Sequence, residues 1–193
     1  MFILSKRSTV ILGVALSIVM WMTRGLHVAT PTHLPDASWA IFFLLGFYFR
    51  QSMVLPIFLA QAALIDYVAI TQFGVDPYCV TPAYVFLLPA YSALWLAGRW
   101  YAAHYQFQVR TLPLFAAAAV SGAAICELIS SGSFYFLGEH FADTSLTVFA
   151  SRLVQYFPAN LASVALYLGI AALIHVLIVS LQHPAATNQS HGQ

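Results

Sequence analysis

The stretch ANLASVALYLGIAALIHVLIVSL, residues 159–181, decides the fold class. It contains no aspartate, glutamate, lysine or arginine, and most of its positions are alanine, leucine, isoleucine or valine. A helix needs roughly 20 apolar residues to cross a hydrocarbon core about 30 Å thick. Residues 159–181 are therefore predicted to form a transmembrane helix. Pro158 is expected to separate it from a shorter helix that holds Arg152.

The composition of the whole chain extends this prediction. Hydrophobic residues make up 61% of the 193 residues and charged residues only 7%, whereas a soluble domain is about 25% charged. So few charges cannot cover a water-facing surface, and we expect most of the surface to face lipid. The net charge of +1 gives no basic field for nucleic acid. The chain also lacks the P-loop, H-E-x-x-H and G-x-S-x-G motifs, so no standard hydrolase is expected.

We predict an all-α, integral membrane bundle of six transmembrane helices in one domain, residues 1–182, with a polar and disordered cytoplasmic tail at 183–193. The apolar runs that form the six spans cover residues 8–22, 37–49, 52–73, 81–98, 111–130 and 159–181. The first run resembles a signal peptide but has no small-x-small cleavage site, so we keep it as a span. Thr81 and Pro82 are the expected cap and first residue of the fourth helix.

Charge predicts the orientation, because cytoplasmic loops carry an excess of lysine and arginine. With the N-terminus in the cytoplasm, five basic residues lie on that side and two on the outer side. The cytoplasmic ones are Lys6, Arg7, Arg50, Arg99 and Arg110, and the outer ones are Arg24 and Arg152. All six acidic residues then fall in outer loops or the outer halves of spans. The pattern predicts a bacterial inner-membrane protein with both termini in the cytoplasm.

The outer loop at 74–80 holds the first candidate functional residue, Cys79. It lies two residues before the expected helix cap, where the positive end of the helix favours thiolate over thiol. A thiolate is a soft ligand suited to a transition metal. The alternatives are an inert cysteine or a disulfide with Cys126.

Two ionisable residues stand out within the spans and near their outer ends. Burying the Asp66 carboxylate in a bilayer costs free energy, so its side chain should face a cavity or a partner. Arg152 is interpreted either as its ion-pair partner, with Glu127 as the other choice, or as a direct contact in a ligand site. His27 and His33 lie in the first outer loop, where most histidines are solvated.

Two tyrosines and a further histidine complete the set of candidates. Tyr78 and Tyr84 flank Cys79, at a depth where tyrosine usually anchors a helix at the membrane interface. His175 lies in the last span and is expected to be hydrogen-bonded between helices.

The nine residues Asp76-Pro77-Tyr78-Cys79-Val80-Thr81-Pro82-Ala83-Tyr84, together with the length and the six spans, resemble the BtuM family of cobalamin transporters. That family is similar to the substrate-binding S-components of energy-coupling factor (ECF) transporters. The resemblance implies a six-helix bundle with an outward-facing ligand cavity. Cys79 matches the family's cysteine that ligates the cobalt of cobalamin. His27, Asp66, Tyr84 and Arg152 fall where supporting residues are expected, as does Tyr78, and His27 is a second candidate cobalt ligand.

Cobalamin is amphipathic, so its cavity needs aromatic and apolar walls with a few polar contacts. Trp39, Tyr78, Tyr84 and residues 134–136 are the expected walls. A thiolate bound to cobalt should displace the nucleotide base or an upper ligand such as cyanide, so that binding modifies the vitamin. This removal of an upper ligand is expected as a side activity of a transporter.

The resemblance leaves the energy source open. An ECF-type energising module is one expected partner, and Gly13 and Ser17 on the first span have the small-residue spacing of a helix-docking face. Ordinary packing within the bundle is the alternative.

Three other functions remain as alternatives. One is a membrane sensory or scaffold domain with no tight ligand. Another is a haem protein using His27 and His175, which the predicted topology places on opposite leaflets. The third is a membrane enzyme, for which no catalytic set is found.

Overall fold

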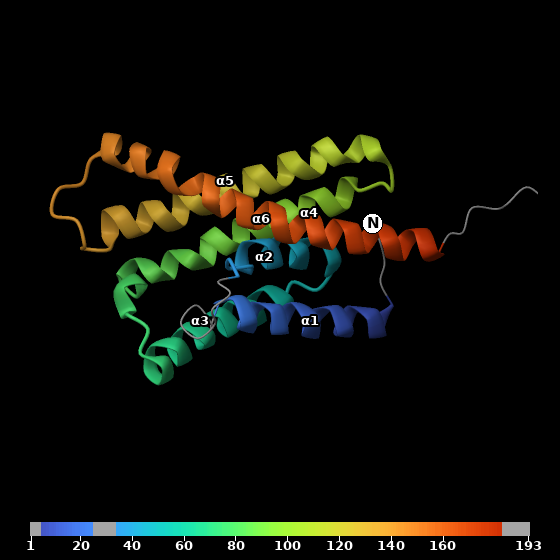
Figure 1. Ribbon diagram of the computed structural model, residues 1–193, viewed down its shortest axis with the longest axis horizontal. Helices are drawn as coiled ribbons and strands as arrows, with labels where there is room; N and C mark the ends of the chain where they lie inside the picture. Colours follow the sequence, from blue (N-terminus) through green and yellow to red (C-terminus); the bar gives the residue numbers. More distant parts are fainter. Residues whose placement is uncertain (1–4, 25–33, 183–193) are drawn as a thin grey trace, which may run out of the picture.

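A computed structural model describes residues 5–24 and 34–182, and these form helices and turns without any strand. The order of elements, shown in Figure 1, is α1 (Lys6–Arg24), α2 (Ser38–Tyr48), α3 (Val54–Phe73), η1 (Pro77–Cys79), η2 (Pro82–Phe86), α4 (Leu87–His104), η3 (Val109–Thr111), α5 (Leu112–Leu137) and α6 (Leu146–Gln182). The all-α prediction is confirmed. The predicted disordered tail, 183–193, lies outside the described residues.

Four of these helices are long and apolar enough to cross a membrane, as expected of a membrane protein. They are α1, α3, α5 together with η3, and α6. Each buries at most a third of its most apolar window inside the bundle, so its remaining apolar side chains form the outer surface. Six membrane crossings stay a prediction, because α2 is short and α4 is less apolar.

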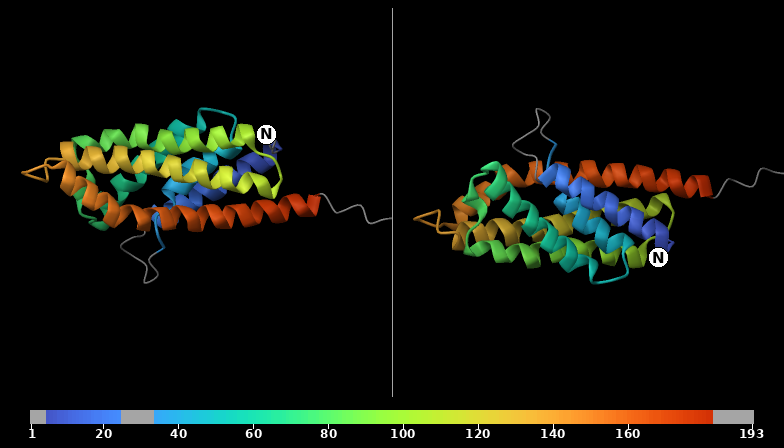
Figure 2. Two further views of the ribbon diagram at one scale, coloured as in Figure 1. Left: turned by 90° about the horizontal axis from the view of Figure 1, so that it is seen from above. Right: turned by 90° about the horizontal axis from the view of Figure 1, so that it is seen from below.

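Helix α2 is short and lies at the centre of the bundle. Nine of its 11 residues are buried, and it contacts α1, α3, α4, α5 and α6. It lies between a layer of α1 and α3 and a layer of α4, α5 and α6 (Figures 1 and 2). A helix that is apolar on all sides is stable when it is surrounded by other helices. The predicted run 37–49 is therefore a central helix, sheltered on all sides by its neighbours.

Two glycines bring α2 and α4 into close contact. A Cβ atom added to Gly46 would overlap the carbonyl oxygen of Trp95, and one added to Gly98 would overlap the carbonyl oxygen of Phe43. Each helix thus presents a glycine to the backbone of the other. Small residues at such crossings let membrane helices approach closely and gain packing energy. The aromatic ring of Phe42 stacks on Tyr91 of α4 at 4.4 Å, beside this crossing.

The last helix corrects the prediction of two helices separated by Pro158. Helix α6 runs without a break over 37 residues and contains Pro158. A proline removes one backbone hydrogen bond, and helices in membranes tolerate that loss where neighbouring groups compensate. At 1.5 Å per residue α6 is roughly 55 Å long, which exceeds the hydrocarbon core. Its C-terminal end projects beyond the other helices (Figure 1).

The start of the fourth span also differs from the prediction. Thr81 is a cap as predicted, since its hydroxyl accepts a hydrogen bond of 3.2 Å from the backbone N–H of Ala83. The turn that follows it is η2, a 3₁₀ helix, and regular α-helix begins only at Leu87. A 3₁₀ turn is a common way to begin or end an α-helix.

The alternating direction of the helices separates the charges. Lys6 begins α1, Arg110 precedes α5, and Arg99 near the end of α4 donates a hydrogen bond of 3.2 Å to the carbonyl oxygen of Arg50. These residues lie at one end of the bundle. The loop at 74–81 and the loop at 138–145 lie at the other (Figure 1). This grouping agrees with the predicted charge asymmetry.

Replacing Gly98 by alanine should destabilise the bundle by about 2 kcal/mol, because the added methyl group forces α2 and α4 apart. Gly169→Ala is the control: it lies on α6 with nothing within 4 Å of the added Cβ, so stability should stay equal or rise slightly. Unfolding of the purified protein in mixed micelles titrated with dodecyl sulfate measures both. Equal stability of the two variants would contradict the close α2–α4 contact.

Candidate functional site

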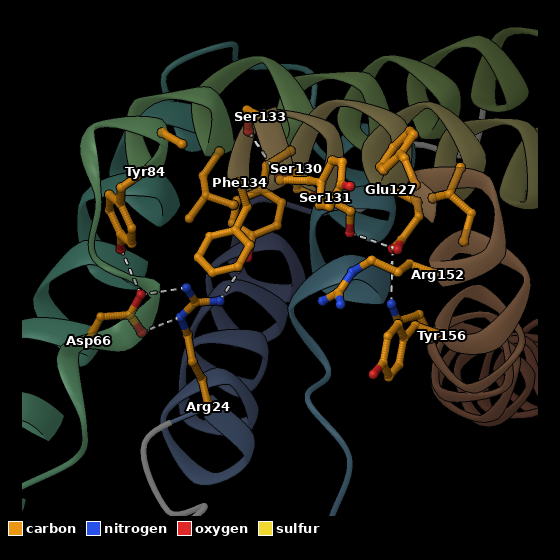
Figure 3. A pocket seen from close by; sticks show the side chains of 17 residues that line it. Arg24, Asp66, Tyr84, Glu127, Ser130, Ser131, Ser133, Phe134, Arg152 and Tyr156 are labelled. Carbon is orange, nitrogen blue, oxygen red and sulfur yellow. Dashed lines mark hydrogen bonds and ion pairs between the residues drawn. The ribbon is translucent and has the colours of Figure 1, made fainter. Parts of the chain in front are cut away.

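A cavity of about 440 Å³ opens at the end of the bundle that carries the loops 74–81 and 138–145 (Figure 3). It collects side chains from α1, α3, η2, α4, α5 and α6. The lining residues are Arg24, Asp66, Ala83, Tyr84, Leu87, Tyr91, Glu127, Ser130, Ser131, Ser133, Phe134, Tyr135, Phe149, Arg152, Leu153, Tyr156 and Asn160. Apolar walls with a few charged groups are typical of a small-molecule site.

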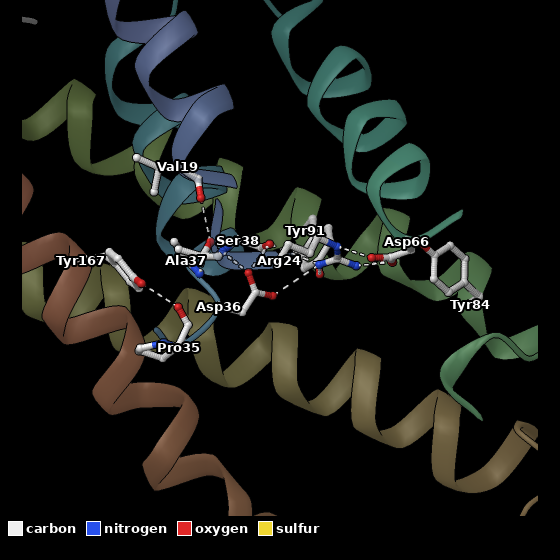
Figure 4. A network of polar contacts seen from close by, with 11 residues as sticks. Val19, Arg24, Pro35, Asp36, Ala37, Ser38, Asp66, Tyr84, Tyr91 and Tyr167 are labelled. Carbon is white, nitrogen blue, oxygen red and sulfur yellow. Dashed lines mark hydrogen bonds and ion pairs between the residues drawn. The ribbon is translucent and has the colours of Figure 1, made fainter. Parts of the chain in front are cut away.

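One wall of the cavity is an ion pair between Arg24 and Asp66. The Arg24 Nε donates to Asp66 Oδ1 at 2.7 Å and the Nη2 to Oδ2 at 2.6 Å. The two side chains are 10% and 22% exposed. Such bidentate arginine–carboxylate pairs are among the strongest charge-assisted hydrogen bonds. The pair joins the last turn of α1 to α3 (Figure 4).

A hydrogen-bond network extends from this pair. The Arg24 Nη1 donates to the Tyr91 hydroxyl at 2.8 Å and to the Ser38 hydroxyl at 3.2 Å, and it lies 3.5 Å from Asp36 Oδ2. Asp36 Oδ1 accepts from the backbone N–H of Ser38 at 2.9 Å. The network therefore ties α1 to the first turn of α2 and to α4 (Figure 4).

Tyr84 of η2 completes the coordination of Asp66. Its hydroxyl donates to Asp66 Oδ2 at 2.6 Å. Asp66 and Tyr84, two of the predicted site residues, are thus in direct contact at the cavity wall.

The alternative that Arg152 forms an ion pair with Asp66 or Glu127 is wrong. Asp66 pairs with Arg24, and Arg152 has no ion pair to any residue in the described ranges. Its guanidinium lies 4.8 Å from the ring centre of Phe141, 5.5 Å from Tyr156 and 6.0 Å from Tyr135. These cation–π contacts hold Arg152 at the cavity, and its contact with a ligand stays a prediction.

Glu127 is a residue that the sequence prediction did not assign to the site. It lies on α5, is 3% exposed and lines the cavity. The Ser131 hydroxyl donates to Glu127 Oε1 at 2.8 Å, and Asn160 Nδ2 of α6 donates to Oε2 at 2.9 Å. A buried acidic residue within an apolar span is by itself a functional signal, and that signal was present in the sequence.

The loop that carries Cys79 packs against the wall of the cavity. The Tyr78 ring stacks on His140 at 4.1 Å and lies 5.5 Å from Phe134, which lines the cavity. The His140 Nε2–H donates to the Tyr78 carbonyl oxygen at 2.8 Å. The backbone of Cys79 ends η1.

Three of the candidate metal-ligating side chains lie outside the described part of the structure. The side chain of Cys79 lies outside the described structure, as do His27 and His33. The disulfide alternative is excluded, because Cys126 is a free and buried thiol. Among the described residues, no cluster of three or more His, Cys, Asp or Glu side chains could hold a metal ion.

The predicted aromatic walls are confirmed in part. Tyr84, Phe134 and Tyr135 line the cavity. Tyr78 does not line the cavity but contacts Phe134, which does. Trp39 packs against the core, and Phe136 packs on Phe149 at 5.3 Å with 40% of its surface exposed. Successive helical residues point in different directions, so a run such as 134–136 cannot all face one cavity.

A second cavity of about 290 Å³ lies at the opposite end, between α2, α4, α5 and α6, and its walls are mainly aromatic and aliphatic. His175 lines it and is hydrogen-bonded to the Tyr48 hydroxyl at 2.9 Å and the Tyr105 hydroxyl at 2.7 Å. The prediction that His175 is hydrogen-bonded between helices is confirmed.

No family model matches this chain, and no curated protein matches it.

Removing one partner of the Arg24–Asp66 pair should destabilise the unliganded protein by about 2 kcal/mol or more, because it leaves a partly buried charge unpaired. We expect this for Arg24→Gln and for Asp66→Asn, with a double variant less destabilised than the sum. Dodecyl sulfate titration measures all three. Arg110→Gln, at the exposed opposite end, is the control. Additive single effects would show that the two residues are not coupled.

Proposed function

We propose that this chain binds cobalamin and takes it up across the bacterial inner membrane, through six membrane crossings with both termini in the cytoplasm. In this proposal the Cys79 thiolate ligates cobalt. The proposal is supported chiefly by the position of the motif at 76–84, which contacts the polar cavity. Tyr84 lines the cavity and holds Asp66, while Tyr78 packs on Phe134 of its wall. Cys79 lies between these two anchored tyrosines in the sequence.

The chemistry of the cavity suits an amphipathic, neutral ligand. Phe134, Tyr135 and Phe149 provide aromatic surface, and Ser130, Asn160 and the charged residues provide hydrogen bonds. A volume of about 440 Å³ holds a drug-sized molecule, and cobalamin is larger than that. The proposal therefore requires that cobalamin fills the cavity with only part of its structure, or that the loop around Cys79 moves outward on binding.

The proposed ligation is a ligand exchange at cobalt. In cyanocobalamin the cobalt–cyanide bond breaks, a cobalt–sulfur bond forms, and the thiol proton leaves with cyanide as hydrogen cyanide. Exchange of the lower nucleotide base instead breaks the cobalt–nitrogen bond and releases the thiol proton to water. Neither exchange is a redox step, so the oxidation state of cobalt does not change.

An ECF-type energising module remains one proposed partner. The small-residue face at Gly13 and Ser17 is used inside the bundle, since the Ser17 hydroxyl donates to Gln61 Oε1 at 3.0 Å and a Cβ on Gly13 would contact the Phe49 ring. Both residues therefore pack within the bundle, and they lend no support to a docking face.

The first test is the visible spectrum of the protein purified with cyanocobalamin. We expect a bound corrinoid whose bands shift as sulfur replaces an axial ligand, and we expect Cys79→Ala to lose that shift. Cys126→Ala changes the other cysteine, which is buried away from the cavity, and should keep the wild-type spectrum. Identical spectra for wild type and Cys79→Ala contradict cobalt ligation. A colourless wild type contradicts cobalamin binding and favours the sensory or scaffold alternative.

The second test is topology. With both termini in the cytoplasm, a green fluorescent protein fused to the C-terminus should fluoresce, and alkaline phosphatase fused there should be inactive. Alkaline phosphatase fused after residue 140 should be active. An active enzyme at the C-terminus would contradict the proposed orientation.

A further inference from the structure

Glu127 and Arg152 face the same cavity from neighbouring helices without pairing. Glu127 lies on α5 and Arg152 on α6, and both line the cavity. Figure 3 shows Glu127 and Arg152 among the side chains that line the pocket. No salt bridge joins them within 4 Å, and each is held by other groups. Two opposite charges that share a cavity and stay apart leave room for a ligand group between them.

Both side chains retain unused hydrogen-bonding capacity. Each Glu127 oxygen accepts one hydrogen bond, from Ser131 or from Asn160, and a carboxylate oxygen can accept two. Arg152 has five N–H donors, and its contacts within the described structure are with aromatic rings. The cavity therefore offers acceptors and donors at two fixed places.

The charges select the class of ligand group. The charged lining consists of Arg24, Asp66, Glu127 and Arg152, whose formal charges sum to zero, and the first two neutralise each other. A cationic ligand group would leave Arg152 unpaired, and an anionic one would be repelled by Glu127. A neutral group with both a donor and an acceptor matches both residues. A primary carboxamide is such a group.

We infer that Glu127 and Arg152 recognise side-chain carboxamides of the ligand, with Glu127 accepting from the amide N–H and Arg152 donating to a carbonyl oxygen. The inference rests on the proposed function, because the side chains around the corrin ring of cobalamin are carboxamides. It adds selectivity: Glu127 rejects corrinoids in which the facing amide has been hydrolysed to a carboxylate. A site built to hydrogen-bond one group discriminates strongly against an analogue that cannot make the bond.

The test compares cobalamin with its separated monocarboxylic acids, in each of which one amide has become a carboxylate. Binding to the purified full-length protein is measured by calorimetry at neutral pH. We expect at least one of these acids to bind wild type at least about tenfold more weakly than cobalamin. Acids altered at amides that do not face Glu127 should bind as cobalamin does.

Glu127→Gln keeps the acceptor and removes the negative charge, so it should recover most of the lost affinity for that acid. Glu139→Gln makes the same change on an exposed residue outside the cavity and should keep the wild-type discrimination. Equal binding of cobalamin and every acid by wild type overturns the inference while the proposed function stands. Discrimination that persists unchanged in Glu127→Gln also overturns it. If wild type binds neither cobalamin nor the acids, the proposed function itself is wrong.

Discussion

The close approach of α2 and α4 at Gly46 and Gly98 holds the centre of the bundle together. Between membrane helices the hydrophobic effect gives little driving force, so tight packing must hold the bundle together. The two glycines bring backbone against backbone and fix α2 at the centre. The ring of Phe42 stacks on Tyr91 at this packed centre, and Tyr91 also lines the polar cavity. The open spaces of the bundle therefore lie at its two ends.

The two ends have different chemistry because of the residues that line them. At one end His175 is bonded to Tyr48 and Tyr105 within an apolar cavity. At the other end four charged residues gather in one cavity. Charged groups within a membrane protein are costly, and they usually face partners or a functional cavity. Arg24 and Asp66 satisfy each other and join α1 to α3, which makes them the rigid wall. Glu127 and Arg152 are not paired with each other, and we infer that they contact the ligand.

The sequence was sufficient to predict an all-α fold. It was less informative about which side chains contact one another. The apolar runs predicted α1, α2 and α3 to within two residues at each end, because the length of an apolar run is a local property. Helix α4 begins and ends six residues later than its predicted run, and α5 extends seven residues beyond its run. The helix break predicted at Pro158 was wrong, because the free-energy cost of a proline within a helix depends on the neighbouring helices. Asp66 was correctly expected to need a partner. That partner is Arg24, 42 residues away, and only the packing of α1 on α3 decides this. The roles of Cys79 and His27 stay predictions from the resemblance at 76–84.

We propose that the sulfur atom of Cys79 binds the cobalt of cobalamin. Cobalt K-edge X-ray absorption on the protein loaded with cobalamin tests this most directly, because the scattering of the first shell distinguishes sulfur from nitrogen, carbon and oxygen. Our account predicts one sulfur scatterer bound to cobalt. A first shell that contains only lighter atoms would contradict it.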